Sequence, residues 1–350
     1  MGKTKISILG HFGFGRKLLN GQTVKTKVLA QALCEALGEE RVCCVDTYGG
    51  KKVLMKAPFQ VWKAVRGAEN VVMLPAHNGL RVYGPLLALA RRRFRGCKLH
   101  YIVIGGWLPE FLESRSWLKK CLLGFDGIYV ETQTMKRALE KQGFSNIFVM
   151  PNCKELPVLL PEELQMEYRE PYRVCTFSRV MREKGIEDAV EAVNAVNTYF
   201  GRTVYALDIY GQVDPGQETW FEELRRTFPK WIRYVGQVPF DKSVETLKDY
   251  YALLFPTRFY TEGVPGTIID AYAAGIPVIA AKWESFGDII REEYTGVGYR
   301  FGDQQELEEK LRYACEHPEQ WNAMRPMCLE EAEKYRPENV IRTIIDRMEA

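Results

Sequence analysis

The chain has 350 residues, more than one compact core holds comfortably, so we expect two domains of similar size. Hydrophobic residues make up 46% and charged residues 27%, a composition that excludes disordered and fibrous proteins. No apolar run approaches the ~18 residues that span a bilayer, and the first residues lack a signal-peptide pattern, so we expect a cytoplasmic protein.

The charge is distributed unevenly along the chain. Residues 1–150 contain 24 Lys and Arg against 10 Asp and Glu, a balance of +14, and the remainder contains 24 against 35, a balance of −11. This asymmetry predicts that the first half meets an anionic surface or ligand. Nine cysteines without a C-x-x-C pair indicate reduced thiols.

The first half alternates short apolar runs with helical patterns. The runs that predict strands are Lys5–Leu9, Val42–Val45, Val71–Leu74, Leu99–Ile104, Gly127–Val130 and Ile147–Met150. The helical patterns are Val24–Leu37, Gln60–Arg66, Leu80–Arg93, Leu108–Leu123 and Thr134–Gln142. Such alternation predicts parallel βαβ units. We expect a first domain at 1–155 and a proline-interrupted linker at 156–171.

Alternation then resumes in a second domain at 172–330. Its predicted strands are Val174–Phe177, Tyr205–Tyr210, Ile232–Val235, Ala252–Phe255 and Pro277–Ala281, and its predicted helices are Ile186–Tyr199, Glu218–Phe228 and Thr267–Ala274. The fold class that we expect is α/β, with two Rossmann-like doubly wound domains facing across a cleft.

Residues 252–281 combine a buried strand, a loop and a helix start. Glu262 lies in the loop, and the N–H groups of Gly266 and Thr267 are unpaired at the helix start, where they can receive phosphate or sugar oxygens. The carboxylates of Glu262 and Asp270 suit vicinal hydroxyls of a hexose and a ribose. The alternative is an ordinary loop with a solvated glutamate.

The segment EGVPGTIIDAYAAGIPVIA resembles the donor-site signature of retaining GT-B glycosyltransferases of the fourth sequence family, glycosyl transferases group 1. That signature has a second glutamate after seven intervening residues, where this chain has Asp270. The resemblance implies that Glu262 holds the donor sugar and Asp270 the ribose. It also implies that a donor site is formed by Gly263, Val264, Gly266 and Thr267.

Two cations follow the strand Val174–Phe177. Arg179 and Lys184 lie just before a helix start, where they can neutralise a diphosphate, although two solvated charges in a turn remain the alternative. The segment resembles the family's Gly-Arg-x4-Lys-Gly pattern, with Ser178 in place of the first glycine. The resemblance implies that both cations stabilise the leaving nucleoside diphosphate.

The first glycine-rich loop, Gly10–Gly15, does not have the G-x-G-x-x-G spacing of dinucleotide-binding proteins. Gly21 and Gln22 follow it at a helix start, and resemblance to the family's Gly-Gly loop implies that they contact the β-phosphate. Asn20 stands where a glycine is common in the family. Asp46, after the second strand, leaves an NAD-dependent oxidoreductase as a rival hypothesis.

His11 and His77 lie on loops at the ends of strands and are acceptor-side candidates; the alternative is a locally hydrogen-bonded histidine. Many relatives have an acceptor-side histidine where this chain has Gly105-Gly106-Trp107, so no catalytic histidine is carried over. No Asp-x-Asp pair and no metal-ligand spacing occurs in the sequence, so we expect no metal and no cofactor.

A basic and apolar segment lies at residues 86–95. Five further cations would extend the patch, Lys51, Lys52, Lys56, Lys63 and Arg66. This pattern is typical of contact with an anionic membrane surface, and also of an ordinary helix whose end is complemented by cations. No recognition motif for nucleic acid accompanies the charge.

The resemblance thus implies a retaining, metal-independent glycosyltransferase that moves a hexose-type sugar from a UDP- or GDP-sugar. We expect a lipid-linked or glycan acceptor, a role in assembling a bacterial capsule or exopolysaccharide, and a peripheral position on the inner face of the membrane. The resemblance also implies that a C-terminal helix at 331–350 returns to the first domain. A nucleotide-sugar epimerase and a non-catalytic nucleotide-sugar-binding subunit are the other rivals.

Overall fold

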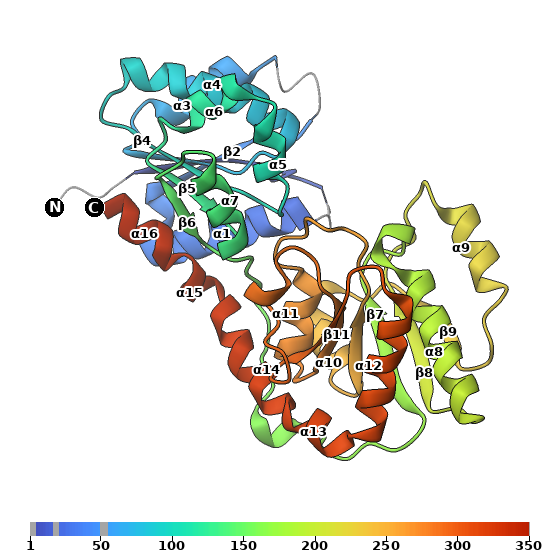
Figure 1. Cartoon of the computed structure of the whole chain (residues 1–350). Coiled ribbons are helices and arrows are strands. Elements are labelled where there is room, and N and C mark those ends of the chain that lie inside the picture. Colours follow the sequence, from blue (N-terminus) through green and yellow to red (C-terminus); the bar gives the residue numbers. More distant parts are fainter. Residues whose placement is uncertain (1–4, 17–20, 50–54, 350) are drawn as a thin grey trace. The chain divides into compact units, whose positions relative to one another are not determined.

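The structure is a computed structural model that describes residues 5–16, 21–49 and 55–349, so Asn20, Lys51 and Lys52 lie outside the described residues. The chain divides into two compact units (Figure 1). Unit 1 consists of residues 1–155 and 335–350, and unit 2 of residues 156–334. The segment at 156–171, expected as a linker, therefore belongs to unit 2.

In its described part, unit 1 contains a parallel sheet with the strand order β2-β1-β3-β4-β5-β6. The strands are β1 Ile6–Gly10, β2 Val42–Asp46, β3 Asn70–Met73, β4 Lys98–Ile102, β5 Gly127–Val130 and β6 Ile147–Val149. The helices are α1 Gly21–Leu37, α3 Ala57–Val65, α4 His77–Arg93, α5 Leu108–Glu113, α6 Ser116–Leu122, α7 Gln133–Lys141, α15 Pro337–Val340 and α16 Arg342–Glu349.

Two hydrophobic clusters form the core of unit 1 because helices cover both faces of the sheet (Figure 1). Helices α3, α4, α5 and α6 contribute to the cluster that contains Leu9, and α1, α15 and α16 to the cluster that contains Ile8. Successive residues of β1 thus point to opposite faces. Lys98 Nζ donates a hydrogen bond of 3.1 Å to the Met348 carbonyl oxygen, which ties α16 to this unit.

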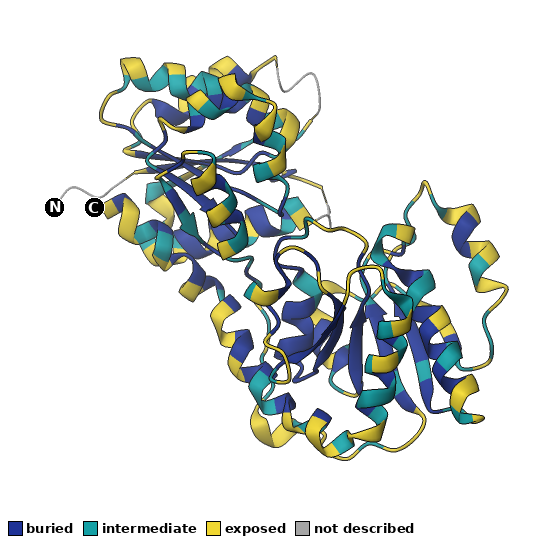
Figure 2. Cartoon of the chain, in the orientation of Figure 1, coloured by how far each residue is buried: buried dark blue, intermediate teal, exposed yellow. Residues whose placement is uncertain are grey.

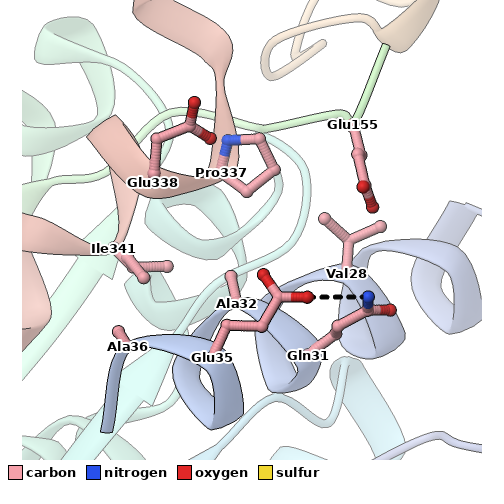
Figure 3. A pocket seen from close by; sticks show the side chains of 9 residues that line it. All are labelled: Val28, Gln31, Ala32, Glu35, Ala36, Glu155, Pro337, Glu338 and Ile341. Carbon is pink, nitrogen blue, oxygen red and sulfur yellow. Dashed lines mark hydrogen bonds between the residues drawn. The ribbon is translucent and has the colours of Figure 1, made fainter.

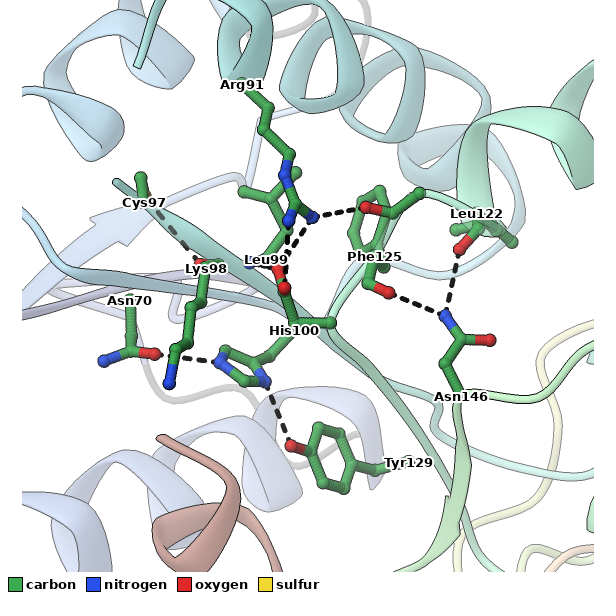
Figure 4. A network of polar contacts seen from close by, with 12 residues as sticks. Asn70, Arg91, Cys97, Lys98, Leu99, His100, Leu122, Phe125, Tyr129 and Asn146 are labelled. Atoms are coloured by element: carbon green, nitrogen blue, oxygen red, sulfur yellow. Dashed lines mark hydrogen bonds and ion pairs between the residues drawn. The ribbon is translucent and has the colours of Figure 1, made fainter. Parts of the chain in front are cut away.

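A buried polar network connects β3, β4 and β5 (Figure 4). His100 Nε2 donates to Asn70 Oδ1 at 2.9 Å, and its Nδ1 accepts from the Tyr129 hydroxyl at 3.0 Å. Nearby, Arg91 forms a bidentate ion pair with Asp126 at 2.7 and 2.9 Å. Because both ring nitrogens of His100 have partners inside the core, its role is structural.

Unit 2 contains a second parallel sheet in its described part, with the order β12-β11-β10-β7-β8-β9. The strands are β7 Tyr172–Phe177, β8 Tyr205–Tyr210, β9 Ile232–Gly236, β10 Ala252–Phe255, β11 Val278–Ala281 and β12 Gly296–Tyr299. The helices are α8 Ile186–Phe200, α9 Glu218–Arg225, α10 Ser243–Leu247, α11 Gly266–Ala273, α12 Gln304–Glu316, α13 Pro318–Ala323 and α14 Arg325–Ala332.

The core of unit 2 is formed mainly by α8 and α12 packed against the sheet, and dark blue residues mark it in Figure 2. These two Rossmann-like α/β units confirm the predicted fold class, and the cleft predicted between them stays a prediction. Among the described residues, no helix has both the length and the apolar character needed to cross a membrane.

Candidate functional site

In unit 2 the strand order reverses between β7 and β10, and the segments that leave the carboxyl ends of these strands build the candidate site. Ligands of open α/β sheets bind in the crevice at such a reversal. Arg179 and Lys184 follow β7, and Glu262 follows β10. The predicted cations and the predicted sugar-binding carboxylate therefore lie at the same edge of one sheet.

Lys184 and Glu262 contact each other directly. Lys184 Nζ donates to Glu262 Oε1, and the two side chains are 18% and 17% exposed. Thr257 Oγ1 donates to the same carboxylate oxygen at 3.2 Å, and Lys184 Nζ lies 5.0 Å from the ring centre of Phe259. The pair thus presents a cation and an acceptor-only carboxylate side by side, groups that suit a phosphate and sugar hydroxyls.

Arg179 lies in a different set of contacts. Its guanidinium forms a 3.3 Å ion pair with Asp214, which comes from the loop between β8 and α9, and its side chain is about half exposed. In the described structure no hydrogen bond or ion pair joins Arg179 to Lys184 or Glu262. The β7–α8 and β8–α9 loops are therefore joined through Arg179, while the β7–α8 and β10–α11 loops are joined through Lys184.

The start of α11 offers polar groups to a ligand. No side chain caps this helix at Pro265, and its first turn contains no acidic residue. In the described structure the hydroxyl Oγ1 of Thr267 is buried without a hydrogen-bond partner, which costs about 1–3 kcal/mol. Gly263 and Val264, both buried, precede this turn. A helix start with unsatisfied donors is a favourable place for phosphate oxygens.

Asp270, the predicted ribose contact, lies on the buried side of α11. Its side chain belongs to a residue that is 3% exposed, and Oδ1 accepts a 2.9 Å hydrogen bond from Ser243 Oγ of α10. The carboxylate is thus held against a neighbouring helix, and the ribose contact stays a prediction.

Gly185 fixes the turn that carries Lys184. Its φ is +67°, a left-handed conformation that favours glycine, and a Cβ atom there would lie 1.8 Å from the Pro256 carbonyl oxygen. Only glycine lets the β7–α8 turn approach the end of β10 this closely. The contact between Lys184 and Glu262 depends on that approach.

Residues 171–317 match the family model described as Glycosyl transferases group 1. Unit 2 contains a glycosyl transferases group 1 domain. The match covers the segments that carry Arg179, Lys184 and Glu262, and the two six-stranded sheets agree with a GT-B glycosyltransferase fold.

One curated relative and two solved structures illustrate the similarity. The amylovoran biosynthesis glycosyltransferase AmsK of Erwinia amylovora is 23% identical over 155 residues, 42% of this chain and 38% of that protein, so the matched stretch spans about two fifths of the relative's length. A sucrose-phosphate synthase structure from Thermosynechococcus elongatus superposes with a TM-score of 0.77 at 15% identity, covering 98% of each chain. The structure of Anabaena Alr3699/HepE in complex with UDP superposes with a TM-score of 0.74 at 13% identity, covering 99% of this chain and 100% of that one.

The two acceptor-side candidates of unit 1, His11 and His77, also flank a reversal of strand order. In this unit the reversal lies between β1 and β3. His11 follows β1, and its Nδ1 lies 2.7 Å from Thr23 Oγ1. His77 begins α4 after β3, and its ring stacks on Trp107 with the centres 3.9 Å apart. Partial burial and the charges of Arg81 and Arg115 lower the pKa of His77. Both histidines thus stay acceptor-side candidates.

The exposed Gly21 and the half-buried Gln22 begin α1, and a Cβ atom at Gly21 would meet none of the described residues within 4 Å. The Gln22 carbonyl oxygen accepts a 2.7 Å hydrogen bond from Thr26 Oγ1, as ordinary helix geometry allows. The predicted contact of Gly21 and Gln22 with the β-phosphate stays a prediction.

Asp46 has a structural task in this GT-B chain. Its carboxylate accepts 3.0 Å hydrogen bonds from the backbone N–H groups of Phe12 and Phe14, so it holds the glycine-rich loop. Because the Asp46 carboxylate already accepts these backbone hydrogen bonds, the oxidoreductase hypothesis is weakened. That hypothesis needs the same carboxylate to bind a ribose hydroxyl.

Sequence reasoning missed a buried ion pair in unit 1. Lys25 Nζ lies 2.5 Å from Glu131 Oε1, both residues are 4% exposed, and the same oxygen accepts a 3.0 Å hydrogen bond from the Gly105 N–H group. The two partners are 106 residues apart in the sequence, so no local pattern could have predicted that they pair.

A cavity of about 290 Å³ lies in unit 1 between α1 and α15 (Figure 3). Glu35, Glu155 and Glu338 surround an apolar floor. None of the predicted site residues lines it. Within residues 5–16, 21–49 and 55–349, no group of three or more His, Cys, Asp or Glu side chains is arranged to hold a metal ion.

Proposed function

We propose that the protein is a retaining glycosyltransferase that moves a hexose from a UDP- or GDP-sugar to a lipid-linked or glycan acceptor. The group 1 match supports sugar transfer, and the UDP in the Alr3699/HepE structure supports a nucleotide donor. The relative named for amylovoran biosynthesis supports a role in assembling a bacterial surface polysaccharide, as capsule or exopolysaccharide.

The observation that carries the proposal is the contact between Lys184 and Glu262 beside the uncapped start of α11. A nucleoside diphosphate sugar contains both the anionic oxygens that Lys184 attracts and the hydroxyls from which Glu262 can accept hydrogen bonds. The unpartnered Thr267 hydroxyl can donate to a phosphate oxygen there. One ligand of this kind satisfies all three groups.

In the proposed reaction, the acceptor hydroxyl attacks the anomeric carbon on the face from which the diphosphate leaves. The bond from the anomeric carbon to the phosphate oxygen breaks, its electron pair goes to the diphosphate, and the acceptor proton passes to that phosphate. Arg179 and Lys184 stabilise the negative charge that develops, which is usually the largest single contribution in such chemistry. We propose that these cations, without a metal ion, neutralise the diphosphate.

We also propose that unit 1 binds an anionic membrane surface on the inner face of the cell membrane. Helices α3, α4 and α6 contain seven Lys and Arg residues and no acidic residue within their bounds. Exposed apolar side chains accompany these charges, led by Phe59, Leu89 and Trp117 at 66%, 60% and 51% exposure. Exposed residues line the outer sides of these helices in Figure 2. Cations mixed with exposed aromatic residues are typical of membrane-interface contact.

A thermal-shift screen of UDP-, GDP- and ADP-sugars tests the donor site, because a ligand at 100 times its Kd adds roughly 2.7 kcal/mol of stability. NMR of the transfer product then gives the anomeric configuration. An inverted product would contradict retention, and activity that vanishes on chelation and returns with Mg²⁺ would contradict metal independence.

The rivals give different results in the same experiment. An epimerase converts the donor without an acceptor, and a binding subunit is stabilised by a donor that it never consumes. If no nucleotide sugar stabilises the protein, the proposed function is wrong.

A further inference from the structure

Two arginines and three aromatic rings form a compact group in unit 1, which we name the His77 cluster. Its members are His77, Arg81, Trp107, Phe111 and Arg115. They come from the start of α4, from the segment that follows β4, from α5 and from the turn before α6. Two segments of the chain, residues 77–81 and 107–115, thus converge on this cluster.

The rings pack against one another in the cluster. His77 stacks on Trp107, and each of these rings meets Phe111 edge-on with the centres 5.1 Å apart. Trp107 is fixed further because its Nε1 donates a 2.8 Å hydrogen bond to the Ile104 carbonyl oxygen. The side chain of His77, by contrast, belongs to an exposed residue. The cluster is therefore a rigid base with an accessible imidazole.

Two positive charges share the Phe111 ring. The guanidinium carbons of Arg81 and Arg115 lie 5.2 and 4.0 Å from its centre. Arg115 Nη1 donates to the Phe111 carbonyl oxygen at 2.7 Å and to Ser114 Oγ at 3.0 Å. Across the described residues, neither arginine forms an ion pair with a carboxylate, although α5 carries the exposed Glu110 and Glu113.

The position of the cluster points to a ligand. His77 follows β3, at the reversal of strand order between β1 and β3, and this is where open α/β sheets bind ligands. Two like charges beside one ring repel each other, and an anion placed near both would relieve that repulsion. Guanidinium groups offer paired donors that match phosphate and carboxylate oxygens.

We propose that the His77 cluster binds an anionic group, phosphate or carboxylate, carried by the acceptor saccharide. The identity of the ligand as an acceptor rests on the proposed glycosyltransferase function, whereas the anion site itself does not. Arg81 and Arg115 bind the anion, and His77 contacts the adjoining sugar. The acceptor class is therefore a glycan with a phosphate, as in a lipid diphosphate carrier, or an acidic sugar.

The test uses the whole chain and follows the His77 imidazole by NMR. The probes are a hexose 1-phosphate, a hexuronate and the neutral methyl hexoside. Binding of an anion beside His77 raises its pKa, because a nearby negative charge favours the imidazolium. We expect either anionic probe, but not the neutral one, to shift this titration. The hexose 1-phosphate arm stands for a phosphate-linked acceptor and the hexuronate arm for an acidic sugar.

Arg81→Gln and Arg115→Gln should each weaken the binding of the anionic probe about tenfold to a hundredfold. This is the usual cost of losing a hydrogen bond to a charged group. Arg342→Gln on α16, an exposed arginine of the same unit, is the matched control and should leave probe affinity unchanged. Equal affinity in all three variants, or equal binding of the neutral probe, would overturn the proposal.

Binding of UDP and of GDP is measured in the same variants and should not change, because the proposed cations and carboxylate of the donor site lie in unit 2. If neither UDP nor GDP binds any form of the protein while the anionic probes still shift His77, the glycosyltransferase proposal fails and the anion site stands. If UDP or GDP binds and the probes do not shift His77, the anion site fails alone.

Discussion

At the residue scale, the contact between Lys184 and Glu262 combines the two functions that a donor site needs in one place. The sequence predicts both residues, because each lies in a motif that follows a strand. The hydrogen bond from Thr257 to Glu262 and the pairing of Arg179 with Asp214 were not predicted. Such pairings depend on how different loops of the sheet edge meet, and no local pattern in a single sequence encodes that.

Lys184→Gln should lower kcat on the order of 10²–10³, by analogy with the removal of one donor that stabilises a developing negative charge. Arg182→Gln is the matched control, since Arg182 lies in the same turn but pairs with Glu187 at 3.3 Å and stacks on Trp220. Steady-state kinetics with a nucleotide sugar measures both variants. Equal losses in the two would show that the turn matters and that the Lys184 charge does not.

His100 should remain neutral down to about pH 4, because burial lowers its pKa to about 4. An unfolded histidine titrates near 6.5, so the unfolded chain binds the extra proton first as the pH falls. Unit 1 therefore keeps full stability above about pH 6.5 and loses stability progressively toward pH 4, by about 2–4 kcal/mol from this residue. NMR titration of the imidazole measures the pKa, and amide exchange in β3–β5 measures the stability.

His100→Gln should make the stability of unit 1 less dependent on pH between 6.5 and 4, because the titrating group is gone. An imidazole of His100 that titrates near 6.5 in the folded protein would contradict this account.

At the element scale, the β7–α8 turn sets the position of the site cations. Gly185→Ala combines left-handed strain with a clash against the Pro256 carbonyl oxygen, so it should destabilise unit 2 by about 2–4 kcal/mol. Gly201→Ala separates the two effects, since Gly201 has φ +63° but a Cβ atom there would meet none of the described residues within 4 Å. The control substitution should lower the free energy of unfolding of unit 2 by about 1 kcal/mol.

Thermal unfolding of the two variants gives the comparison. A loss of stability in Gly185→Ala no larger than in Gly201→Ala would mean that the close approach to Pro256 relaxes freely. In that case the turn does not fix Lys184 as described.

Element boundaries show where local patterns are insufficient. The helix predicted at Leu108–Leu123 is two helices, because Arg115 leaves helical geometry and its guanidinium donates to the Phe111 carbonyl oxygen. The only proline of the run, Pro109, lies in the first turn, and no Gly or Pro stands near Arg115 to signal the break. Strand β12 was not predicted either, since two of its four residues are glycines, which are depleted in strands. Parallel pairing with β11 forms it instead.

At the scale of the whole molecule, the +14 balance of the first half, and the acidic remainder, predicted an anionic partner without indicating a surface. The structure adds that α3 and α4 pack side by side and that α6 packs on α4, so their cations share one layer. By contrast α8, which covers the sheet of unit 2, contains three acidic residues and no basic one. The sequence could not predict this grouping, because it depends on which helices cover the same face.

Arg92→Gln with Arg93→Gln should weaken binding to vesicles of phosphatidylglycerol and phosphatidylcholine by about 2 kcal/mol, roughly thirtyfold, at ~1 kcal/mol per cation. Both residues are exposed at the end of α4, whereas the neighbouring Arg91 pairs with Asp126 and is left intact.

Lys27→Gln with Arg342→Gln removes the same charge from α1 and α16, which cover the other face. This control should bind vesicles as the parent does, because charges on the opposite face lie farther from the lipid than screening allows. Equal weakening by both pairs would show that net charge, and not the α3–α4–α6 face, governs binding. Unchanged transfer to a soluble acceptor would confirm that the first pair affects only the surface.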